Sequence, residues 1–321
     1  MNQVALITGI TGQDGIILSN ALVRNGIKVH GTTRSLDNLT KVRLSYIENS
    51  SKLFLHEVNL IRETSLQNLL NSVNPTVIFN FGSMSSVRDS FQNPIQAKES
   101  IEKPTEYILK WIKNKSPRTV FFNPASSEMF GDTNGRADEN HLFHPKSPYA
   151  QAKTNAYNLS KVYREEFGLN VINGILFNHE SHYRHSKFFS KKVITTACAI
   201  YNGQMKKLSI GNLHGIRDWG WANDYVTAML ALVENNKFED YVIATGEGNS
   251  LENFIKTVFT KLDLEWLEHT EVNSDEYRTN DITTSIGNPS KIMGEVRWMP
   301  SKTFDQLIDN LIEEHLKNPH E

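Results

Sequence analysis

Tyr149 and Lys153 are the residues whose types and spacing most directly suggest chemistry. They lie four apart in Ser-Pro-Tyr-Ala-Gln-Ala-Lys, residues 147–153, so on a helix their side chains share one face. An ammonium group beside a phenol stabilises the phenolate and lowers the tyrosine pKa, which would make Tyr149 a usable base near neutral pH. Tyr157 and Lys161 have the same spacing. Only Tyr149 begins a predicted helix directly after Ser-Pro, so we interpret the second pair as ordinary helix residues.

A serine and a glutamate follow the predicted strand that precedes this helix. The strand covers Thr119–Asn123, with Ser126 and Glu128 after it, which places a hydroxyl and a carboxylate at the carboxyl edge of the sheet, where ligands bind. Taken singly, Ser126 could be a turn serine and Glu128 a surface carboxylate. An alcohol dehydrogenase or reductase needs only Ser, Tyr and Lys. A dehydratase must also remove a C–H proton beside a carbonyl and expel hydroxide, and Glu128 could move that proton.

A glycine-rich loop follows the first predicted strand and precedes a helix. Its spacing is G-x-x-G-x-x-G, and its candidate cofactor-binding residues are Gly9, Thr11, Gly12, Gln13, Asp14 and Gly15. Glycines here permit a tight turn, close approach of backbone to a pyrophosphate and close helix–strand packing, and the helix N-terminus offers free N–H groups to phosphates. The loop could simply need flexible residues, but its place before a helix in an alternating chain favours dinucleotide binding.

The end of the second predicted strand bears on the choice between NAD and NADP. An acidic residue there would bind the ribose 2′-hydroxyl, and the segment Val29–Ser35 has none. Arg34 stands where a 2′-phosphate would lie, followed by Lys41 and Arg43, and a guanidinium suits a phosphate dianion. Arg34 could also be a solvated surface residue. The sequence favours NADP.

Alternation of short β-rich runs with amphipathic helices predicts an α/β fold, a doubly wound parallel sheet (Rossmann-like) with a smaller α/β substrate-binding lobe. The expected strands of the first half are Gln3–Thr8, Lys28–Thr33, Lys52–Asn59, Val77–Phe81, Thr119–Asn123 and Asn170–Phe177. The expected helices are Ile16–Asn25, Ser65–Val73, Ile101–Asn114 and Tyr149–Phe167. Residues 1–177 should form the NADP-binding domain, with return segments from about 215–250, and residues 178–321 mainly the substrate-binding lobe.

Bulk properties exclude several classes. The net charge of −2 over 321 residues gives no electrostatic footprint for nucleic acid, and no apolar run approaches the roughly eighteen residues of a membrane span. The single cysteine, Cys198, excludes an internal disulfide and indicates a cytoplasmic protein. The eleven histidines show no metal-ligand spacing. We therefore expect no metal, nucleic-acid or membrane partner.

At this point the chain resembles the GDP-mannose 4,6-dehydratase family, part of the extended short-chain dehydrogenases/reductases. The resemblance rests on Ala5–Gly15, Asn173–Ser181, Arg217–Gly220 with Asp224–Val226, and Tyr241–Glu247. It implies conversion of GDP-mannose to GDP-4-keto-6-deoxymannose by internal hydride transfer through bound NADP, in a homo-oligomer, dimer or tetramer. The segment from Arg34 to Arg43 would form a subunit interface.

The resemblance also implies residue roles. Ser126 stands at the family's catalytic threonine, and Glu128, Tyr149 and Lys153 at its glutamate, tyrosine and lysine. Further positions implied to contact the cofactor are Asn59, Leu60, Phe81, Gly82, Ser83, Ser85, His179 and Arg184. Positions implied near the nucleotide sugar are Ser86, Asn178, Lys192, Arg217 and Arg278.

Departures from the family pattern leave alternatives open. Asn59 replaces a usual aspartate, Ser35 a second arginine, Met84 a glutamine and Ser86 a histidine, and Pro104 stands about where a glycine is common. A GDP-manno-heptose dehydratase, a GDP-sugar reductase or epimerase on the same scaffold, and a non-catalytic NADP-binding regulator therefore stay as alternatives. Glu128 argues against a simple reductase, and the intact Ser, Tyr and Lys argue against the regulator.

Overall fold

A seven-stranded parallel sheet forms the centre of the computed structural model, which describes residues 3–48, 50–273 and 281–317. The strand order is β11-β7-β5-β4-β1-β2-β3, and every pair is parallel. The strands are β1 (Val4–Thr8), β2 (Lys28–Thr33), β3 (Leu53–Glu57), β4 (Val77–Asn80), β5 (Val120–Ser126), β7 (Val171–Leu176) and β11 (Asp240–Ile243). The chain reverses direction across the sheet between β1 and β4, where dinucleotides bind in folds of this type.

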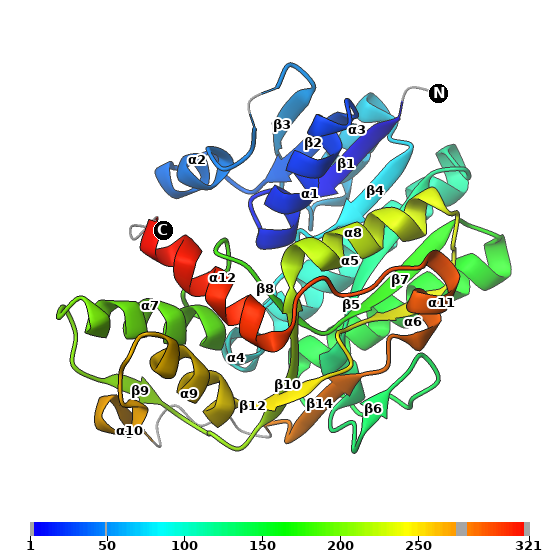
Figure 1. Ribbon diagram of the computed structural model, residues 1–321. Helices are drawn as coiled ribbons and strands as arrows, with labels where there is room; N and C mark the ends of the chain where they lie inside the picture. Colours follow the sequence, from blue (N-terminus) through cyan, green and yellow to red (C-terminus); the bar gives the residue numbers. More distant parts are fainter. Residues whose placement is uncertain (1–2, 49, 274–280, 318–321) are drawn as a thin grey trace.

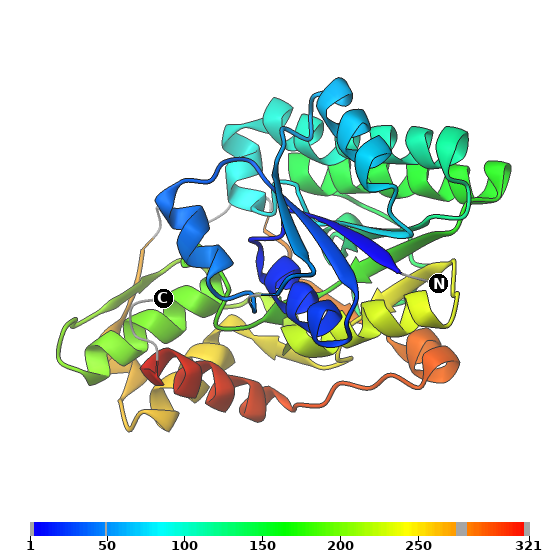
Figure 2. The same cartoon turned by 90° about the horizontal axis from the view of Figure 1, so that it is seen from above.

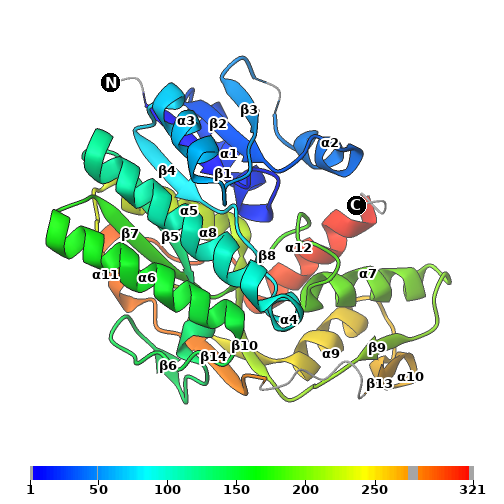
Figure 3. The same cartoon turned by 180° about the vertical axis from the view of Figure 1, so that it is seen from behind.

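Helices cover both faces of this sheet (Figures 1 and 2). One face carries α1 (Gln13–Arg24), α8 (Ala222–Glu234) and α11 (Ser290–Val296). The other carries α3 (Glu63–Val73), α5 (Pro94–Lys115) and α6 (Pro148–Phe167), which stand together in the view from behind (Figure 3). Because both faces are covered, strands such as β7 are buried along their whole length. The predicted doubly wound α/β fold is confirmed.

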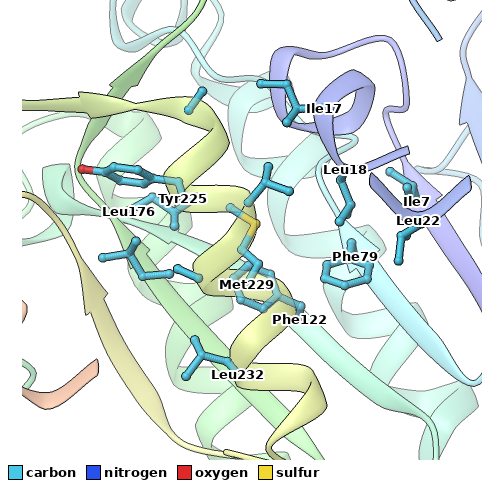
Figure 4. Packing of buried hydrophobic residues seen from close by; sticks show 14 of the residues in the cluster. Ile7, Ile17, Leu18, Leu22, Phe79, Phe122, Leu176, Tyr225, Met229 and Leu232 are labelled. Atoms are coloured by element: carbon cyan, nitrogen blue, oxygen red, sulfur yellow. The ribbon is translucent and has the colours of Figure 1, made fainter. Parts of the chain in front are cut away.

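The main core lies between the sheet and helices α1 and α8. Ile7, Phe79 and Phe122 project from the strands toward Leu18 of α1 and Met229 of α8 (Figure 4). All five side chains are fully buried. Residues from positions 7 to 229 therefore share one hydrophobic cluster, and α8 and β11 belong to the first lobe although they come late in the chain.

A second lobe lies beside the carboxyl edge of the sheet. Its helices are α7 (Phe189–Tyr201), α9 (Leu251–Lys261), α10 (Trp266–His269) and α12 (Phe304–Lys317), and its core is separate from the first. Its strands are β6 (Arg136–Ala137), β8 (Asn178–Glu180), β9 (Leu208–Ile210), β10 (Ile216–Trp221), β12 (Gly248–Ser250), β13 (Thr270–Val272) and β14 (Thr284–Gly287). Strand β10 pairs with β8, β12 and β14.

Several element boundaries differ from expectation. The strand predicted to end at Asn123 continues through Pro124 to Ser126 as β5, because β7 pairs with it over that length. The helix predicted from Ile101 begins at Pro94, a residue favoured in the first helical turn, and continues through Pro104. The short helices α2 (Asn38–Leu44) and α4 (Val87–Gln92) were not predicted, since α2 buries no residue and α4 only Ser90.

Candidate active site

A cavity of about 630 Å³ lies between the two lobes at the carboxyl edge of the sheet. Apart from Arg217, thirteen of its lining residues were given site roles from the sequence: Asp14, Phe81, Ser83, Ser85, Ser86, Ser126, Glu128, Tyr149, Lys153, Asn178, His179, Arg184 and Lys192. Arg217 lines it as well, from the second lobe. The cavity therefore brings together residues separated by about two hundred positions in the chain.

Ser126, Glu128 and Tyr149 form its chemical centre. Ser126 ends β5 and accepts a hydrogen bond from the Glu128 amide at 3.3 Å, which fixes the turn that presents Glu128. The Ser147 hydroxyl caps α6 by accepting from the Ala150 amide at 3.1 Å. Tyr149 lies in the first turn of α6 and is 8% exposed.

The pKa of Tyr149 moves opposite to the sequence-based expectation. Burial raises it to about 12; a hydrogen bond with Ser126 opposes this, and the Glu128 charge adds to it. Lys153 Nζ lies 5.8 Å from the centre of the Tyr149 ring and donates to the Pro124 carbonyl at 2.7 Å. The net direction of the tyrosine pKa is upward because burial dominates, so the expected fall is not seen in this structure.

Lys153 lies beneath the same site. Burial lowers its pKa to about 8, partly offset by Asp14. Pro124 of β5 has no amide N–H to donate, but its carbonyl points toward α6 and accepts the hydrogen bond from Lys153. Strand β5 therefore positions the ammonium group of Lys153. Tyr157, in contrast, donates to Asp240 at 2.6 Å and belongs to a buried network with Arg164. It is a structural residue, in keeping with its interpretation as an ordinary helix residue.

The glycine loop is shaped so that its backbone can approach a ligand closely. Gly9 has φ +66°, and a Cβ there would lie 2.7 Å from the Gly82 Cα. A Cβ on Gly15 would lie 2.7 Å from the Gly9 carbonyl oxygen, whereas Gly12 has only that oxygen within 4 Å, at 3.3 Å. Gly12 is also the N-cap of α1. The loop therefore fits a dinucleotide pyrophosphate, with free N–H groups at the helix start.

Asp14 and His179 connect this loop to β8. His179 Nε2 lies 3.0 Å from Asp14 Oδ1. Gln13 Nε2 donates to the His179 carbonyl at 2.9 Å, and the Ser181 hydroxyl donates to Gln13 Oε1 at 2.8 Å. Burial tends to raise the pKa of Asp14, but His179 more than offsets this, so the pKa lies below its usual value.

The remaining predicted residues divide by location. Gly82 and Leu60 pack together below the glycine loop. Asn59 is exposed, and its side-chain oxygen accepts a hydrogen bond from the Ile61 amide at 3.2 Å. Arg34 is exposed directly after β2. These positions follow the carboxyl ends of β4, β3 and β2. None of them lines the cavity. Arg278 lies outside the described residues.

Three further basic groups line the cavity, of which Arg184 lies close enough to Asp14 and His179 to affect the pKa of both. Arg217 Nη2 lies 3.1 Å from Asp281 Oδ1 and is 6% exposed. Lys192 lies at the start of α7. Arg184 pairs with Glu180 at 3.2 Å and stacks over the Phe188 ring at 3.8 Å. Such groups suit a diphosphate.

Sequence reasoning missed the residues of α4 and, in the segment after β8, Lys187. Arg88, Asp89 and Gln92 line the cavity, as does Lys187, whose Nζ lies 2.7 Å from Asp89 Oδ2. Asp281 was missed as well. No local pattern marks these residues, because their function depends on which segments fold against one another.

Among the described residues, no group of three or more His, Cys, Asp or Glu side chains could hold a metal ion. Within the same ranges, no helix combines the length and apolar character that crossing a bilayer requires.

Known proteins resemble the chain over nearly its whole length. Residues 6–311 match the family described as GDP-mannose 4,6 dehydratase. The protein named GDP-mannose 4,6 dehydratase 2 from Arabidopsis thaliana is 35% identical over 325 residues, covering 98% of this chain and 87% of the plant protein.

Solved structures confirm the fold. A dTDP-glucose 4,6-dehydratase from Bacillus anthracis, in complex with NAD, has a TM-score of 0.85 at 20% identity, covering 98% of this chain and 97% of that one. The structure of RMD from Pseudomonas aeruginosa complexed with NADPH has a TM-score of 0.79 at 17% identity, covering 97% and 98%.

Proposed function

The chain belongs to the GDP-mannose 4,6-dehydratase family, and on that premise we propose that it is a hydro-lyase that converts GDP-mannose to GDP-4-keto-6-deoxymannose. The observation that carries the proposal is Glu128 in the same cavity as Ser126, Tyr149 and Lys153. A reductase or epimerase on this scaffold has no step that requires the extra carboxylate. Dehydration does, because a proton must leave the carbon beside the new carbonyl.

Each side chain has a defined task. A bound nicotinamide cofactor supplies a hydride acceptor at sugar C4 and later a hydride donor at C6. Tyr149 removes the O4 proton, and Lys153 carries a positive charge beneath it. Glu128 takes the C5 proton, which the 4-keto group makes acidic, and passes it to the C6 hydroxyl, which leaves as water. When hydride returns to C6, C5 takes up a proton that balances the one removed from O4. Ser126 polarises the sugar oxygen through a hydrogen bond.

NADP is the cofactor we propose. NAD and NADPH occur in the similar structures from B. anthracis and P. aeruginosa, which supports a nicotinamide dinucleotide. Arg34, exposed directly after β2, and Arg43, whose Nε donates to the Thr11 carbonyl at 3.0 Å, place positive charge beside the adenosine end of the loop. The segment Val29–Ser35 carries no acidic residue that would favour NAD.

The proposed binding roles follow the two lobes. Residues 1–177, with return segments from about 215–250, hold the cofactor through the loop Gly9–Gly15. Residues 178–321 mainly hold the nucleotide sugar. The basic residues Lys192 and Arg217 face the diphosphate, with Arg278 assigned to the same role on the family pattern alone.

We also propose a homo-oligomer in the cytoplasm. Leu36, Leu39 and Val42 are 44%, 69% and 52% exposed in and before α2, which leaves an apolar helix face for a second copy of the chain. The single cysteine, Cys198, suits a reducing compartment.

The decisive experiment incubates the purified protein with GDP-mannose without added cofactor. Mass spectrometry should show loss of one water, because hydride taken from C4 returns to C6 and the bound cofactor is regenerated. An unchanged mass with inverted sugar stereochemistry would indicate an epimerase. A product formed only with stoichiometric NADPH would indicate a reductase, and either result would overturn the proposal.

A further inference from the structure

Both ring nitrogens of His179 face hydrogen-bond acceptors. Nδ1 lies 2.7 Å from the Phe177 carbonyl oxygen, and Nε2 lies 3.0 Å from Asp14 Oδ1. A carbonyl oxygen and an ionised carboxylate can only accept, so both ring nitrogens must donate. A neutral imidazole carries a single N–H. The geometry is therefore that of an imidazolium ion.

The packing around the ring fixes this arrangement. His179 is 7% exposed and stacks on Tyr225 of α8, with ring centroids 4.5 Å apart and an interplanar angle of 18°. Stacking holds the ring plane, and the two acceptors hold its rotation. Asp14 cannot move away, because it lies in the first turn of α1 beside Gln13, which is itself bonded to β8.

Charges from every side contribute to the protonation state. Burial lowers the pKa of His179, the Asp14 carboxylate raises it, Arg184 lowers it and the bond to Phe177 raises it. The net direction is upward from 6.5. Tyr225, the group above the ring, is a neutral phenol because burial raises its pKa well above 10. The attraction of Asp14 thus outweighs both burial and the neighbouring guanidinium.

The position of Asp14 gives the positive charge of His179 a role in ligand binding. A carboxylate in the first turn of a helix that receives a pyrophosphate places negative charge beside an anionic ligand. We propose that His179 is a positioning residue that holds its proton to neutralise Asp14, so that the glycine loop accepts the cofactor pyrophosphate only while His179 is charged. The inference rests on the proposed function, because it assumes that the loop binds the dinucleotide.

The charge state can be measured directly, without any ligand. NMR of the full chain with ¹⁵N-labelled histidine should show one ring with two protonated nitrogens at pH 7, and this signal should vanish in His179→Gln. His185→Gln provides the control in a nearby segment: burial lowers the pKa of His185, so this substitution should leave the imidazolium signal intact. A His179 ring with one protonated nitrogen at pH 7 would overturn the inference and leave dehydration untouched.

Cofactor binding tests the consequence. The Kd for NADP⁺, measured by calorimetry from pH 6 to 9, should increase by up to about tenfold per pH unit above the pKa of His179. His179→Gln should weaken binding about tenfold or more at pH 7. Asp14→Asn should flatten the pH profile, and the double variant should recover most of the affinity lost in His179→Gln, because no carboxylate then needs neutralising.

The outcomes separate the two claims. A pH profile retained in Asp14→Asn, or no recovery in the double variant while both remain folded by circular dichroism, would overturn the neutralising role alone. Failure of the wild-type protein to bind NADP⁺ at any pH would overturn the inference and the proposed function together.

Discussion

Burial shifts the pKa values of Tyr149 and Lys153 in opposite directions, and in both residues it disfavours the charged form. It raises the pKa of the phenol to about 12 and lowers that of the amine to about 8, so it favours the uncharged form of each group. Near neutral pH the phenol is therefore uncharged, whereas the amine, with a pKa of about 8, still carries its proton.

Lys153→Met should abolish turnover without loss of stability. The pKa of Lys153 in the folded chain, about 8, lies below its ordinary 10.5, so between these values the unfolded chain binds more protons. Burying the charged Lys153 therefore lowers the wild-type free energy of unfolding at pH 7. This loss disappears as the pH rises from about 8 to 10.5, a change of about 3 kcal/mol at about 1.4 kcal/mol per pH unit.

Urea unfolding of both proteins at pH 7 and pH 10 measures this effect. The advantage of Lys153→Met over wild type should shrink by about 2–3 kcal/mol between the two pH values. Lys98→Met, at an exposed site on α5, should show no such change. A stability difference independent of pH would contradict the effect of burial on Lys153.

Glu128→Gln should lower turnover by about 10²- to 10⁴-fold, because the amide cannot take the C5 proton. NADP⁺ affinity should stay at the wild-type value, since the role proposed for the glutamate is toward the sugar and not toward the glycine loop. Glu165→Gln, on the exposed surface of α6, is the matched control and should turn over normally. Near-normal product formation by Glu128→Gln would refute its assigned role.

At the scale of elements, the turn from β1 to α1 decides whether the cofactor can bind. Gly9 supplies a left-handed backbone conformation, and its neighbour in space is the Gly82 backbone, which cannot move aside as a side chain could. The loop therefore depends on two glycines from different strands. The N–H groups at the start of α1, beside Gly12, can bind phosphate only while the Gly9 and Gly82 backbones stay in close contact.

Gly9→Ala should destabilise the protein and abolish dinucleotide binding. The left-handed conformation alone costs about 1–2 kcal/mol, and the backbone contact at 2.7 Å adds to it. Gly168→Ala is the control, since Gly168 has φ +67° but nothing within 4 Å of the added Cβ. It should lower thermal stability slightly and leave binding of NADP⁺ unchanged. Equal loss of binding in both variants would show that the close approach to Gly82 is not needed.

At the scale of the whole molecule, the cavity exists only because segments late in the chain pack back onto the first lobe. Strand β11 adds to the edge of the first sheet and α8 packs on α1, while β10, which directly precedes α8 in the sequence, pairs with strands of the second lobe. The two lobes are thus joined by alternating segments and not by one linker. Lys187 and Asp89, which both line the cavity, form an ion pair.

The exposed apolar face of α2 predicts self-association. Leu39→Asp combined with Val42→Asp should lower the molar mass measured by light scattering after size-exclusion chromatography, because two charges would enter the proposed contact. Leu142→Asp, at a side chain 73% exposed in a different segment, should leave the mass unchanged. A wild-type monomer, or an oligomer unaffected by the double change, would refute this interface.

The sequence by itself determined the features that depend on local spacing. Gly9–Gly15 before a helix, Tyr149 four residues before Lys153, and Ser126 two before Glu128 are patterns within one turn or loop. Their geometry follows from the helical repeat and from glycine's conformational freedom. The strand–helix alternation determined the parallel sheet for the same reason, since each element must bury one face.

Only the tertiary structure decided what depends on burial and on distant partners. His179 and Asp14 are 165 positions apart, and Arg217 meets Asp281 from a different segment. The direction of the Tyr149 pKa followed from desolvation, which residue spacing does not reveal. Helix α4 contributes to the site although its sequence gives little signal. Charge and solvation at a site depend on every segment packed around it, and that packing is a property of the whole chain.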